Sequence, residues 1–256
     1  MTFSTSVSRV IFKVLQRSEQ STFRSMTSLQ LGDMRKAYIS STLLEDDLPT
    51  RDPIELFEKW FNTIKDAGLM YEPNAVALAT TTKTGLPSCR MVLLKGCGPD
   101  GFVFFTNYKS RKGNELEENP NASMLFYWDK HHRQVRVEGV VEKTSATVSD
   151  NYFHSRPRES QISAVVSEQS RVVESRKHLE EKHQMLQEKY KGADTVIPRP
   201  SEWGGFTLKP KRMEFWQGHS SRLHDRIVFT KLEDDAALPH MARHASNGWI
   251  MQRYAP

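Results

Sequence analysis

The chain has 256 residues and a formal net charge of +5, and its hydrophobic fraction of 38% and charged fraction of 26% favour a soluble protein with a polar appendage. Its apolar runs are far too short to cross a bilayer and two cysteines do not provide a disulfide framework, so we predict no membrane span and a reducing compartment. The positive charge suits nucleic acid, an acidic membrane or phosphorylated small molecules, and the placement of the basic residues has to decide between them.

Residues 1–30 differ in composition from the rest of the chain, because they are rich in Ser and Thr and nearly free of acidic residues. Arg9, Lys13 and Arg17 recur every fourth residue beside an apolar stripe, which is typical of a mitochondrial transit peptide, although a disordered tail fits equally well. We therefore predict a leader, disordered or targeting, over residues 1–30 and a single domain over residues 31–256. The predicted location is cytoplasmic, with a mitochondrial location as the alternative.

The first predicted element of the domain is a helix within RDPIELFEKWFNTIKDAG. Asp52 can cap this helix, Pro53 suits its first turn and Gly68 can end it. Its apolar residues recur at helical spacing, so we expect the helix to pack against a core.

From residue 74 the pattern changes to short β-rich runs separated by turn residues, which predicts antiparallel strands. In chain order the expected strands are 75–82, 88–96, 101–107, 122–128, 133–143, 203–210, 212–218, 222–231 and 247–256. Helices are expected at 111–118, 145–156 and 172–190. This order implies an α+β domain around an antiparallel sheet or barrel.

Two basic clusters in the first half of the chain are candidate anion sites. Ser110, Arg111 and Lys112 open a helix directly after a strand, where free amide groups and the helix dipole favour a phosphate; an exposed basic loop is the alternative. Arg90 and Lys95 lie in an apolar run, and their odd spacing predicts opposite faces of a strand. Such cations need anions if they are buried, unless the strand is an exposed edge.

A third cluster lies in YFHSRPRESQ, where Tyr152, Arg156 and Ser160 recur at four-residue spacing. Together they are the donor set that a phosphomonoester uses. Pro157 argues against one continuous helix through all three, and a solvated helix end is the alternative interpretation.

The stretch EFWQGHSSRLHDRIVF sets Arg222, His224 and Arg226 at strict two-residue spacing. In an extended strand this spacing places all three on one face, as a row of cations and hydrogen-bond donors. His240 and His244 lie one helical turn apart, as a zinc pair would, but further ligands at metal spacing are missing and we predict no metal site.

Several long motifs of the chain resemble, in the same order, those of the pyridoxine (pyridoxamine) 5'-phosphate oxidase family. They are RMVLLKG, FFTNYKSRKG, RQVRVEG, YFHSRPRESQI, VSEQS, WGGF and EFWQGHSSRLHDRIVF, and the resemblance runs from about Met34 to the C-terminal RYAP. It implies an FMN-binding split β-barrel that acts as a homodimer with FMN between the subunits. It also implies an oxidase that converts pyridoxine 5'-phosphate and pyridoxamine 5'-phosphate to pyridoxal 5'-phosphate, with O2 as electron acceptor and H2O2 as product.

The resemblance also implies roles for individual residues. The family pattern assigns to FMN the residues Arg90, Met91, Val92, Leu93, Phe105, Thr106, Arg111, Lys112, Gln134, Gln169, Ser170, Trp216 and Arg226. It assigns to the substrate Lys95, Tyr152, Arg156, Ser160, Arg222, Leu223 and His224, and among these Arg222 and His224 are the expected catalytic pair over the pyridine ring.

Departures from the family pattern and other functions have to be weighed beside it. The segment His219, Ser220, Ser221 differs from the usual loop before the catalytic pair, and Arg35 and Tyr38 resemble the mobile lid of the family. One alternative is a split-barrel protein that binds flavin without this catalysis, but such a carrier has no need of a substrate-covering pair. The other is a basic nucleic-acid-binding protein, which would interleave its aromatic residues with exposed bases. We predict neither a nucleic acid nor a membrane as partner.

Overall fold

The computed structural model describes residues 31, 34, 37, 38, 40–192, 194–233 and 236–256. The chain divides into two compact units, Met1–Ala37 and Tyr38–Pro256, and the fold belongs to the second. The predicted leader, with the mitochondrial alternative that depends on it, lies outside the described residues, as does Arg35.

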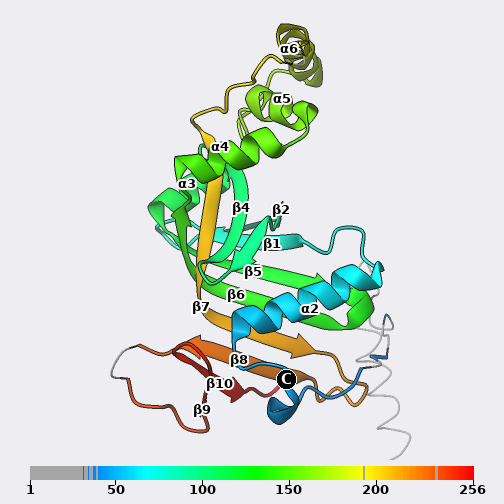
Figure 1. Cartoon of the computed structure of the whole chain (residues 1–256), viewed down its shortest axis with the longest axis vertical. Coiled ribbons are helices and arrows are strands. Elements are labelled where there is room, and N and C mark those ends of the chain that lie inside the picture. The colour runs from blue at the N-terminus through cyan, green and yellow to red at the C-terminus, as the bar shows by residue number, and fades with distance from the viewer. Residues whose placement is uncertain (1–30, 32–33, 35–36, 39, 193, 234–235) are drawn as a thin grey trace, which may run out of the picture. The chain divides into compact units, whose positions relative to one another are not determined.

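In the described part of the chain, ten antiparallel strands form one sheet (Figure 1). The strands are β1 (Ala75–Thr81), β2 (Pro87–Leu93), β3 (Gly96–Gly98), β4 (Gly101–Asn107), β5 (Asn121–Trp128), β6 (Arg133–Lys143), β7 (Trp203–Gln217), β8 (Asp225–Lys231), β9 (Arg243–His244) and β10 (Trp249–Arg253). Their order is β2-β1-β5-β6-β7-β8-β10-β9, with β4 paired to β7 and β3 to β4. No pairing of described strands joins the two ends of this order, so the sheet is not closed.

The long strand β7 divides the sheet, because it changes its neighbour along its length. Its first residues pair with β4, whereas the stretch from Arg212 to Gln217 pairs with β8, and β6 runs along the other edge from Phe206 onward. A bulge in the β6–β7 pairing falls at Gly139, where an added Cβ would lie 2.0 Å from the carbonyl oxygen of Lys209. Only glycine fits there.

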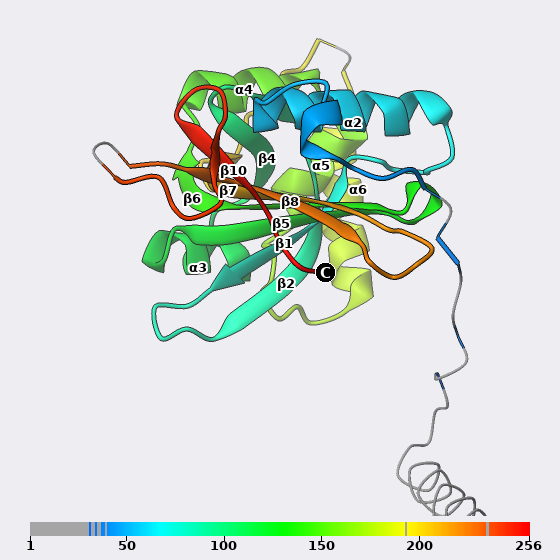
Figure 2. The ribbon, with the colours of Figure 1, turned by 90° about the horizontal axis from the view of Figure 1, so that it is seen from below.

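The helices of the second unit lie on both sides of the sheet. They are α2 (Pro53–Ala67), α3 (Arg111–Glu118), α4 (Ala146–Ser155), α5 (Arg158–Val166) and α6 (Arg176–Lys189), with short 3-10 turns η1 (Glu45–Asp47) and η2 (Asp129–His131). In Figure 2, α2 lies on one side of β5 and β8 and α3 lies on the other. None of the described helices is long and apolar enough to cross a membrane.

The main core forms where α2 covers the sheet. Asp52 accepts hydrogen bonds from the amides of Ile54 and Glu55 and so caps α2, and Gly68 ends the helix in the left-handed conformation, as predicted. Phe57 on α2 is 1% exposed and its ring contacts those of Phe61, Phe102, Phe126 and Trp128. Burial of these aromatic rings fixes α2 against β4 and β5.

A second, smaller core lies under α4, α5 and α6. Its buried members are Phe153, Ile162, Val166, Tyr190, Ile197 and Trp203, the last being the first residue of β7. This cluster attaches the helices beside the start of β7 and the end of β4 (Figure 1), and it therefore sets the position of the side chains that α4 and α5 contribute.

The predicted α+β class with an antiparallel sheet and flanking helices is confirmed, and three predictions on its elements are wrong. The strands expected at 203–210 and 212–218 are one strand, because the bulge opposite Gly139 accommodates Pro210 without ending the pairing. The strand expected at 222–231 begins only at Asp225. The helix expected at 172–190 starts at Arg176, capped by Ser175, and the helix α5 was not expected as a separate element.

Candidate active site

A cavity of about 410 Å³ opens between β2, β4 and the helices α4 and α5. Eleven of the residues that line it belong to the predicted site: Met91, Val92, Leu93, Lys95, Phe105, Thr106, Lys112, Tyr152, Arg156, Ser160 and Gln169. They lie up to 78 positions apart in sequence, between Met91 and Gln169. The fold thus brings together most of the residues that the sequence assigned to a flavin and to a phosphorylated substrate.

Three parallel aromatic rings form one wall of the cavity. The ring of Phe105 stacks on that of Tyr152 at 3.9 Å between centroids, and the Trp203 ring lies nearly parallel beside both, at 5.6 Å from Phe105 and 6.1 Å from Tyr152. The guanidinium group of Arg156 lies over the Trp203 ring at 4.8 Å. The wall offers a flat apolar surface with a cation at its edge, which suits a planar ligand with an anionic group.

Arg156 carries an unused hydrogen-bond donor in this wall. Its Nη1 is buried and has no partner among the described residues. Burial lowers the pKa of Arg156 from its ordinary value, and the neighbouring Tyr152 opposes that shift only in part. Leaving a buried donor without an acceptor costs free energy, so the site favours an anionic ligand that accepts this hydrogen bond.

Tyr152, Arg156 and Ser160 reach the cavity by a route other than one helix face. The helix α4 ends at Ser155, and Pro157 is the N-cap of α5. The turn between the two helices brings the three side chains to one cavity, where proline fixes the backbone between them. The proline thus breaks the helix, as its presence indicated, while the donor set stays together.

Lys112 lines the cavity and is 8% exposed. Its Nζ donates to Oε1 of Gln169 at 2.8 Å and to Oγ1 of Thr106 at 3.1 Å. Burial, together with the nearby charge of Arg90, lowers the pKa of Lys112 to about 8, although the Glu115 carboxylate opposes this change. Lys112 is a cation held without full compensation, which favours an anionic ligand.

Lys112 belongs to the first turn of α3, where the sequence predicted a phosphate site. Ser110 caps this helix by accepting a hydrogen bond from the amide of Gly113 at 3.3 Å. Arg111, with a side chain 58% exposed, lines a neighbouring hollow together with Ser170. The helix dipole and two basic side chains therefore meet at one end of α3.

Arg90 has a side chain 21% exposed and is compensated by an anion, as a partly buried cation in an apolar strand requires. Its Nη2 lies 3.3 Å from Oε2 of the buried Glu115. Lys95 behaves differently, because β2 ends at Leu93 and Lys95 follows it as an exposed residue. The prediction that both cations stand on opposite faces of one strand is therefore wrong for Lys95, which lies beyond the strand.

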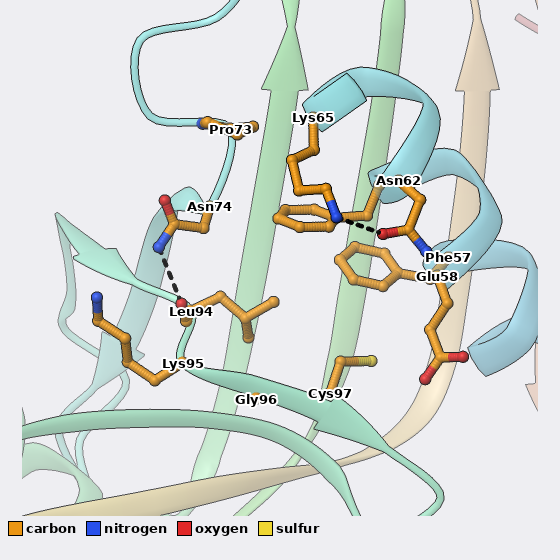
Figure 3. Close-up of a pocket in the computed structure, with 11 residues that line it drawn as sticks. Phe57, Glu58, Asn62, Lys65, Pro73, Asn74, Leu94, Lys95, Gly96 and Cys97 are labelled. Atoms are coloured by element: carbon orange, nitrogen blue, oxygen red, sulfur yellow. Dashed lines mark hydrogen bonds between the residues drawn. The ribbon is translucent and has the colours of Figure 1, made fainter. Parts of the chain in front are cut away.

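Lys95 also lines a second cavity of about 490 Å³ between α2 and β3 (Figure 3). Phe57 and Cys97 point into this space, and Lys95 extends toward the loop of Asn74, whose Nδ2 donates to the carbonyl oxygen of Leu94 at 3.0 Å. Burial raises the pKa of the Cys97 thiol to about 12, so this cysteine is not a nucleophile at neutral pH. Lys95 thus lines both cavities.

The remaining predicted residues form a second group at the far ends of β6, β7 and β8. Gln134 pairs with Trp216, and Trp216 pairs with Arg226, so these three are cross-strand neighbours. Arg226 donates to Oε2 of the buried Glu214 at 2.7 Å and to the carbonyl oxygen of Ala255 at 2.8 Å. These two hydrogen bonds hold the guanidinium group between β7 and the C-terminal residues.

Arg222, Leu223 and His224 lie in the loop before β8, which contradicts the predicted row on one strand face. Arg222 has a φ of 64°, in the left-handed region, and its amide donates to the carbonyl oxygen of His219 at 3.1 Å. The amide of His219 in turn donates to Nδ1 of His224 at 3.0 Å. These bonds close a turn over residues 219–224, so alternation along an extended strand does not apply to it.

The ring of Tyr38 lies between three aromatic side chains of this second group. Its centroid is 4.9 Å from that of His132, 5.7 Å from that of Trp216 and 5.4 Å from that of His224. Tyr38 thus contacts the predicted catalytic histidine, and its role in a lid stays a prediction.

The two groups lie at opposite ends of β7. Trp203 lines the cavity and Trp216 belongs to the second group, and the strand between them has a contour length of about 40 Å. Figure 1 shows β7 running from the region of α4 to its pairing with β8. Within one subunit, no residue of the second group lines the cavity.

Comparisons with known proteins identify the family. A family model described as pyridoxamine 5'-phosphate oxidase matches residues 65–189, and one described as pyridoxine 5'-phosphate oxidase C-terminal dimerisation region matches residues 203–256. The chain is 48% identical over 233 residues to pyridoxine-5'-phosphate oxidase of Bos taurus, covering 90% of this chain and 88% of that protein. The chain belongs to the pyridoxine/pyridoxamine 5'-phosphate oxidase family. The predicted resemblance is thereby confirmed.

Other members and solved structures agree with this assignment. The pyridoxine/pyridoxamine 5'-phosphate oxidase of Burkholderia multivorans is 50% identical over 226 residues, covering 88% of this chain and 99% of that protein. The crystal structure of PhzG from Burkholderia lata, in complex with tetrahydrophenazine-1-carboxylic acid, matches with a TM-score of 0.73 and 29% identity over 85% of this chain and 99% of that one. A pyridoxamine 5'-phosphate oxidase-related, FMN binding protein of Nostoc punctiforme matches in fold, with a TM-score of 0.59 and 13% identity over 84% of this chain and all of that one.

Two features of this oxidase-family site were missed from the sequence. Trp203 had been noticed only as part of the WGGF motif, and its place in the aromatic wall depends on the antiparallel pairing of β4 with β7. Glu115 was not considered, although its position four residues after Arg111 on a predicted helix was a signal for an ion pair.

For the histidine pair, the helical spacing was wrong, since His244 lies in β9 and His240 outside any helix. No group of three or more potential metal ligands occurs in the described residues.

Proposed function

We propose that this protein is an FMN-dependent oxidase that converts pyridoxine 5'-phosphate and pyridoxamine 5'-phosphate to pyridoxal 5'-phosphate, with O2 as electron acceptor and H2O2 as product. The family supports the reaction class. The single observation that carries the proposal is the cavity in which an aromatic wall stands beside a buried, unpartnered Arg156 donor. A phosphorylated aromatic ring satisfies both features at once.

The residues of the site fit a flavin nucleotide. FMN carries a phosphate, and the first turn of α3 offers Arg111, Lys112 and a helix N-terminus for it, with Arg90 close by. Thr106 and Gln169 already hold the Lys112 ammonium group and would orient it toward that phosphate. The backbone and side chains of residues 91–93 line the cavity and offer an edge for the flavin ring. When bound, the flavin supplies a two-electron acceptor that dioxygen can reoxidise.

The substrate phosphate would be bound at the other side of the cavity. Arg156 contributes its free Nη1, Ser160 and Tyr152 contribute hydroxyl groups, and Lys95 contributes an ammonium group from the end of β2. Charge-assisted hydrogen bonds of this kind fix the orientation of a phosphorylated substrate. The phosphate is remote from the reacting carbon, so its binding energy serves to position that carbon.

We further propose that a homodimer completes the site. The second group, with Gln134, Trp216, Arg226 and the catalytic pair, lies at the far end of β7 from the cavity. A second copy related by a two-fold axis can place its own second group over the cavity of the first. The match of residues 203–256 to a dimerisation region supports this arrangement, because that region contains β7, β8 and the loop between them.

The hydrogen bond from His219 determines what His224 can do. Since Nδ1 of His224 accepts from the His219 amide, a neutral ring carries its proton on Nε2. His224 is then a hydrogen-bond donor to a substrate, and Arg222 beside it is a cation. The pair would hold and polarise the substrate ring, while the proton from the substrate amine or alcohol leaves to solvent. Accepting that proton at His224 would require breaking the bond to His219.

The proposal is tested by a visible spectrum taken without air. The purified protein, loaded with FMN, is expected to lose its flavin absorbance when pyridoxamine 5'-phosphate or pyridoxine 5'-phosphate is added, and to regain it with H2O2 formation when air is admitted. Pyridoxamine without phosphate is the matched control and should bleach the flavin far more slowly, because Arg156 and Ser160 would have nothing to bind. A flavin that stays oxidised with both phosphorylated compounds would refute the proposed reaction.

A further inference from the structure

Glu115 places a carboxylate inside the protein, one helical turn after Arg111 on α3. Its side chain is 5% exposed. Oε1 accepts a hydrogen bond from Nε of Arg111 at 2.9 Å, and Oε2 accepts one from Nη2 of Arg90 at 3.3 Å. A single carboxylate therefore joins the helix that opens at the predicted phosphate site to the strand that carries Arg90.

Two hydroxyl groups complete the surroundings of this carboxylate. Thr80 on β1 and Ser88 on β2 both donate to Oε2 of Glu115. Burial alone would raise the pKa of Glu115, but the hydrogen bonds from Ser88, Thr80 and Arg111 outweigh burial and hold the pKa at about 2. Glu115 is consequently an anion throughout the physiological pH range.

The same hydroxyl groups bind Arg90 a second time. Nη1 of Arg90 donates to Oγ1 of Thr80 and to the carbonyl oxygen of Leu78, and Nη2 donates to Oγ of Ser88. Each hydroxyl thus accepts from the guanidinium group and donates to the carboxylate. Arg90 has one orientation in this network, and that orientation depends on the negative charge at its centre.

The charges around Glu115 balance those of a phosphate. Arg90, Arg111 and Lys112 bring three positive charges together, and Glu115 offsets one of them. The remaining two positive charges match a phosphomonoester, which carries roughly two negative charges at neutral pH. Without the carboxylate, the three cations would repel one another and those that are free to turn would separate.

We propose that Glu115 is a positioning residue for the cofactor phosphate, orienting Arg111 toward it and fixing the charge of Arg90 nearby. The inference rests on the proposed function, because it takes FMN as the ligand of the site. Arg111 is the more instructive of the two cations. Among the described residues its hydrogen bonds engage Nε alone, so Glu115 fixes the inner side of the guanidinium group and leaves both terminal nitrogens for a phosphate.

The test compares two flavins that differ only in the phosphate. The apoprotein is titrated with FMN and with riboflavin, and flavin fluorescence gives the two dissociation constants. The quantity compared between variants is the dissociation constant for FMN divided by that for riboflavin. In Glu115→Gln, which keeps the length of the side chain but removes its charge, the dissociation constant for FMN is expected to rise roughly tenfold, while that for riboflavin stays unchanged. A purely structural role would weaken both flavins together.

Glu117→Gln is the matched control, because it makes the same change on the exposed side of the same helix, where Glu117 pairs with Lys109 at 3.8 Å. Its FMN-to-riboflavin ratio should equal that of the wild type. Should Glu115→Gln fail to fold, Glu115→Asp retains the compensating charge but is one methylene too short to reach both guanidinium groups, and an intermediate ratio is expected.

The outcomes separate this inference from the proposed function. A wild-type ratio in both Glu115 variants, or an equal loss for FMN and riboflavin, would overturn the positioning role and leave the oxidase proposal standing. A wild-type apoprotein that binds riboflavin as tightly as FMN would overturn both, because no phosphate would then be recognised. A ratio of the FMN to the riboflavin dissociation constant that is raised in the Glu115 variants and unchanged in Glu117→Gln supports the inference.

Discussion

The depressed pKa of Lys112 makes cofactor binding depend on pH in a way that can be calculated. Burial lowers this pKa first and the charge of Arg90 second, to about 8 in the free protein. A phosphate at the opening of α3 would favour the protonated ammonium group and raise the pKa in the complex. FMN should therefore bind the protonated form, and its affinity should fall as pH rises through the pKa of the free protein.

The size of the effect follows from the fraction of Lys112 that is protonated. With a pKa of about 8, that fraction is about 90% at pH 7 and about 9% at pH 9. The dissociation constant for FMN should thus increase about tenfold between these two pH values. The phosphate itself has its second pKa at about 6 and does not titrate in this range.

Titration of the apoprotein with FMN and with riboflavin at pH 7, 8 and 9 measures the effect. Riboflavin reports any change that the flavin ring or the fold contributes, and only the difference between the two ligands belongs to the phosphate. Lys112→Met should abolish this difference, because methionine has no charge to lose. Affinities for FMN and riboflavin that change in parallel with pH in the wild type would refute the reasoning.

Two further predictions concern the dimer and the core. The Arg156→Ala and Arg222→Ala variants should each have little activity. When they are mixed under conditions that allow subunit exchange, we expect about a quarter of the wild-type activity, because half of the dimers are hybrids and each hybrid has one intact shared site. If native mass spectrometry detects the hybrids but activity does not recover, each site lies within one subunit. Phe57→Ala should lower the free energy of unfolding, measured by urea titration, by roughly 3–5 kcal/mol, because Phe57 is 1% exposed in the core under α2. Tyr71→Ala is the control, since Tyr71 is 99% exposed, and its free energy of unfolding should stay within about 0.5 kcal/mol of the wild-type value.

Local signals predicted those parts of the fold that depend on neighbouring residues. The caps of α2 at Asp52 and Gly68 and the start of α3 at Arg111 depend on short-range contacts, and the structure has all three. The alternating pattern of β6 also gave its bounds correctly, because one face of that strand is buried. Such features can be predicted because the contacts that cause them join residues only a few positions apart.

Features that depend on distant partners were not accessible in the same way. The alternation of Arg222, His224 and Arg226 fits a strand equally well, and only the hydrogen bonds that close the turn at His219 distinguish the two. Pro210 reads as the end of a strand, whereas the glycine that lets the strand continue stands in β6, at Gly139. In both cases the deciding contact lies outside the local pattern.

The candidate site also contains both kinds of feature, those set by local motifs and those set by partners distant in the sequence. Most residues of the cavity lie in motifs that the resemblance had singled out, but it gave no indication that the assigned residues form two groups at opposite ends of β7. Glu115 escaped notice because its partners Thr80, Ser88 and Arg90 lie 25 to 35 residues away along the chain. A buried network of this kind becomes visible only once β1, β2 and α3 are brought together.

The course of β7 has a consequence for how such an enzyme can vary. If one end of this strand lines the cavity of its own subunit and the other end covers that of its partner, a single covalent segment is shared between both reaction centres of the dimer. Adding one residue to it would move one end by about 3.3 Å and turn its side chains to the other face. The length of β7 thus sets the distance between the two reaction centres, and neither centre can be moved without affecting the other.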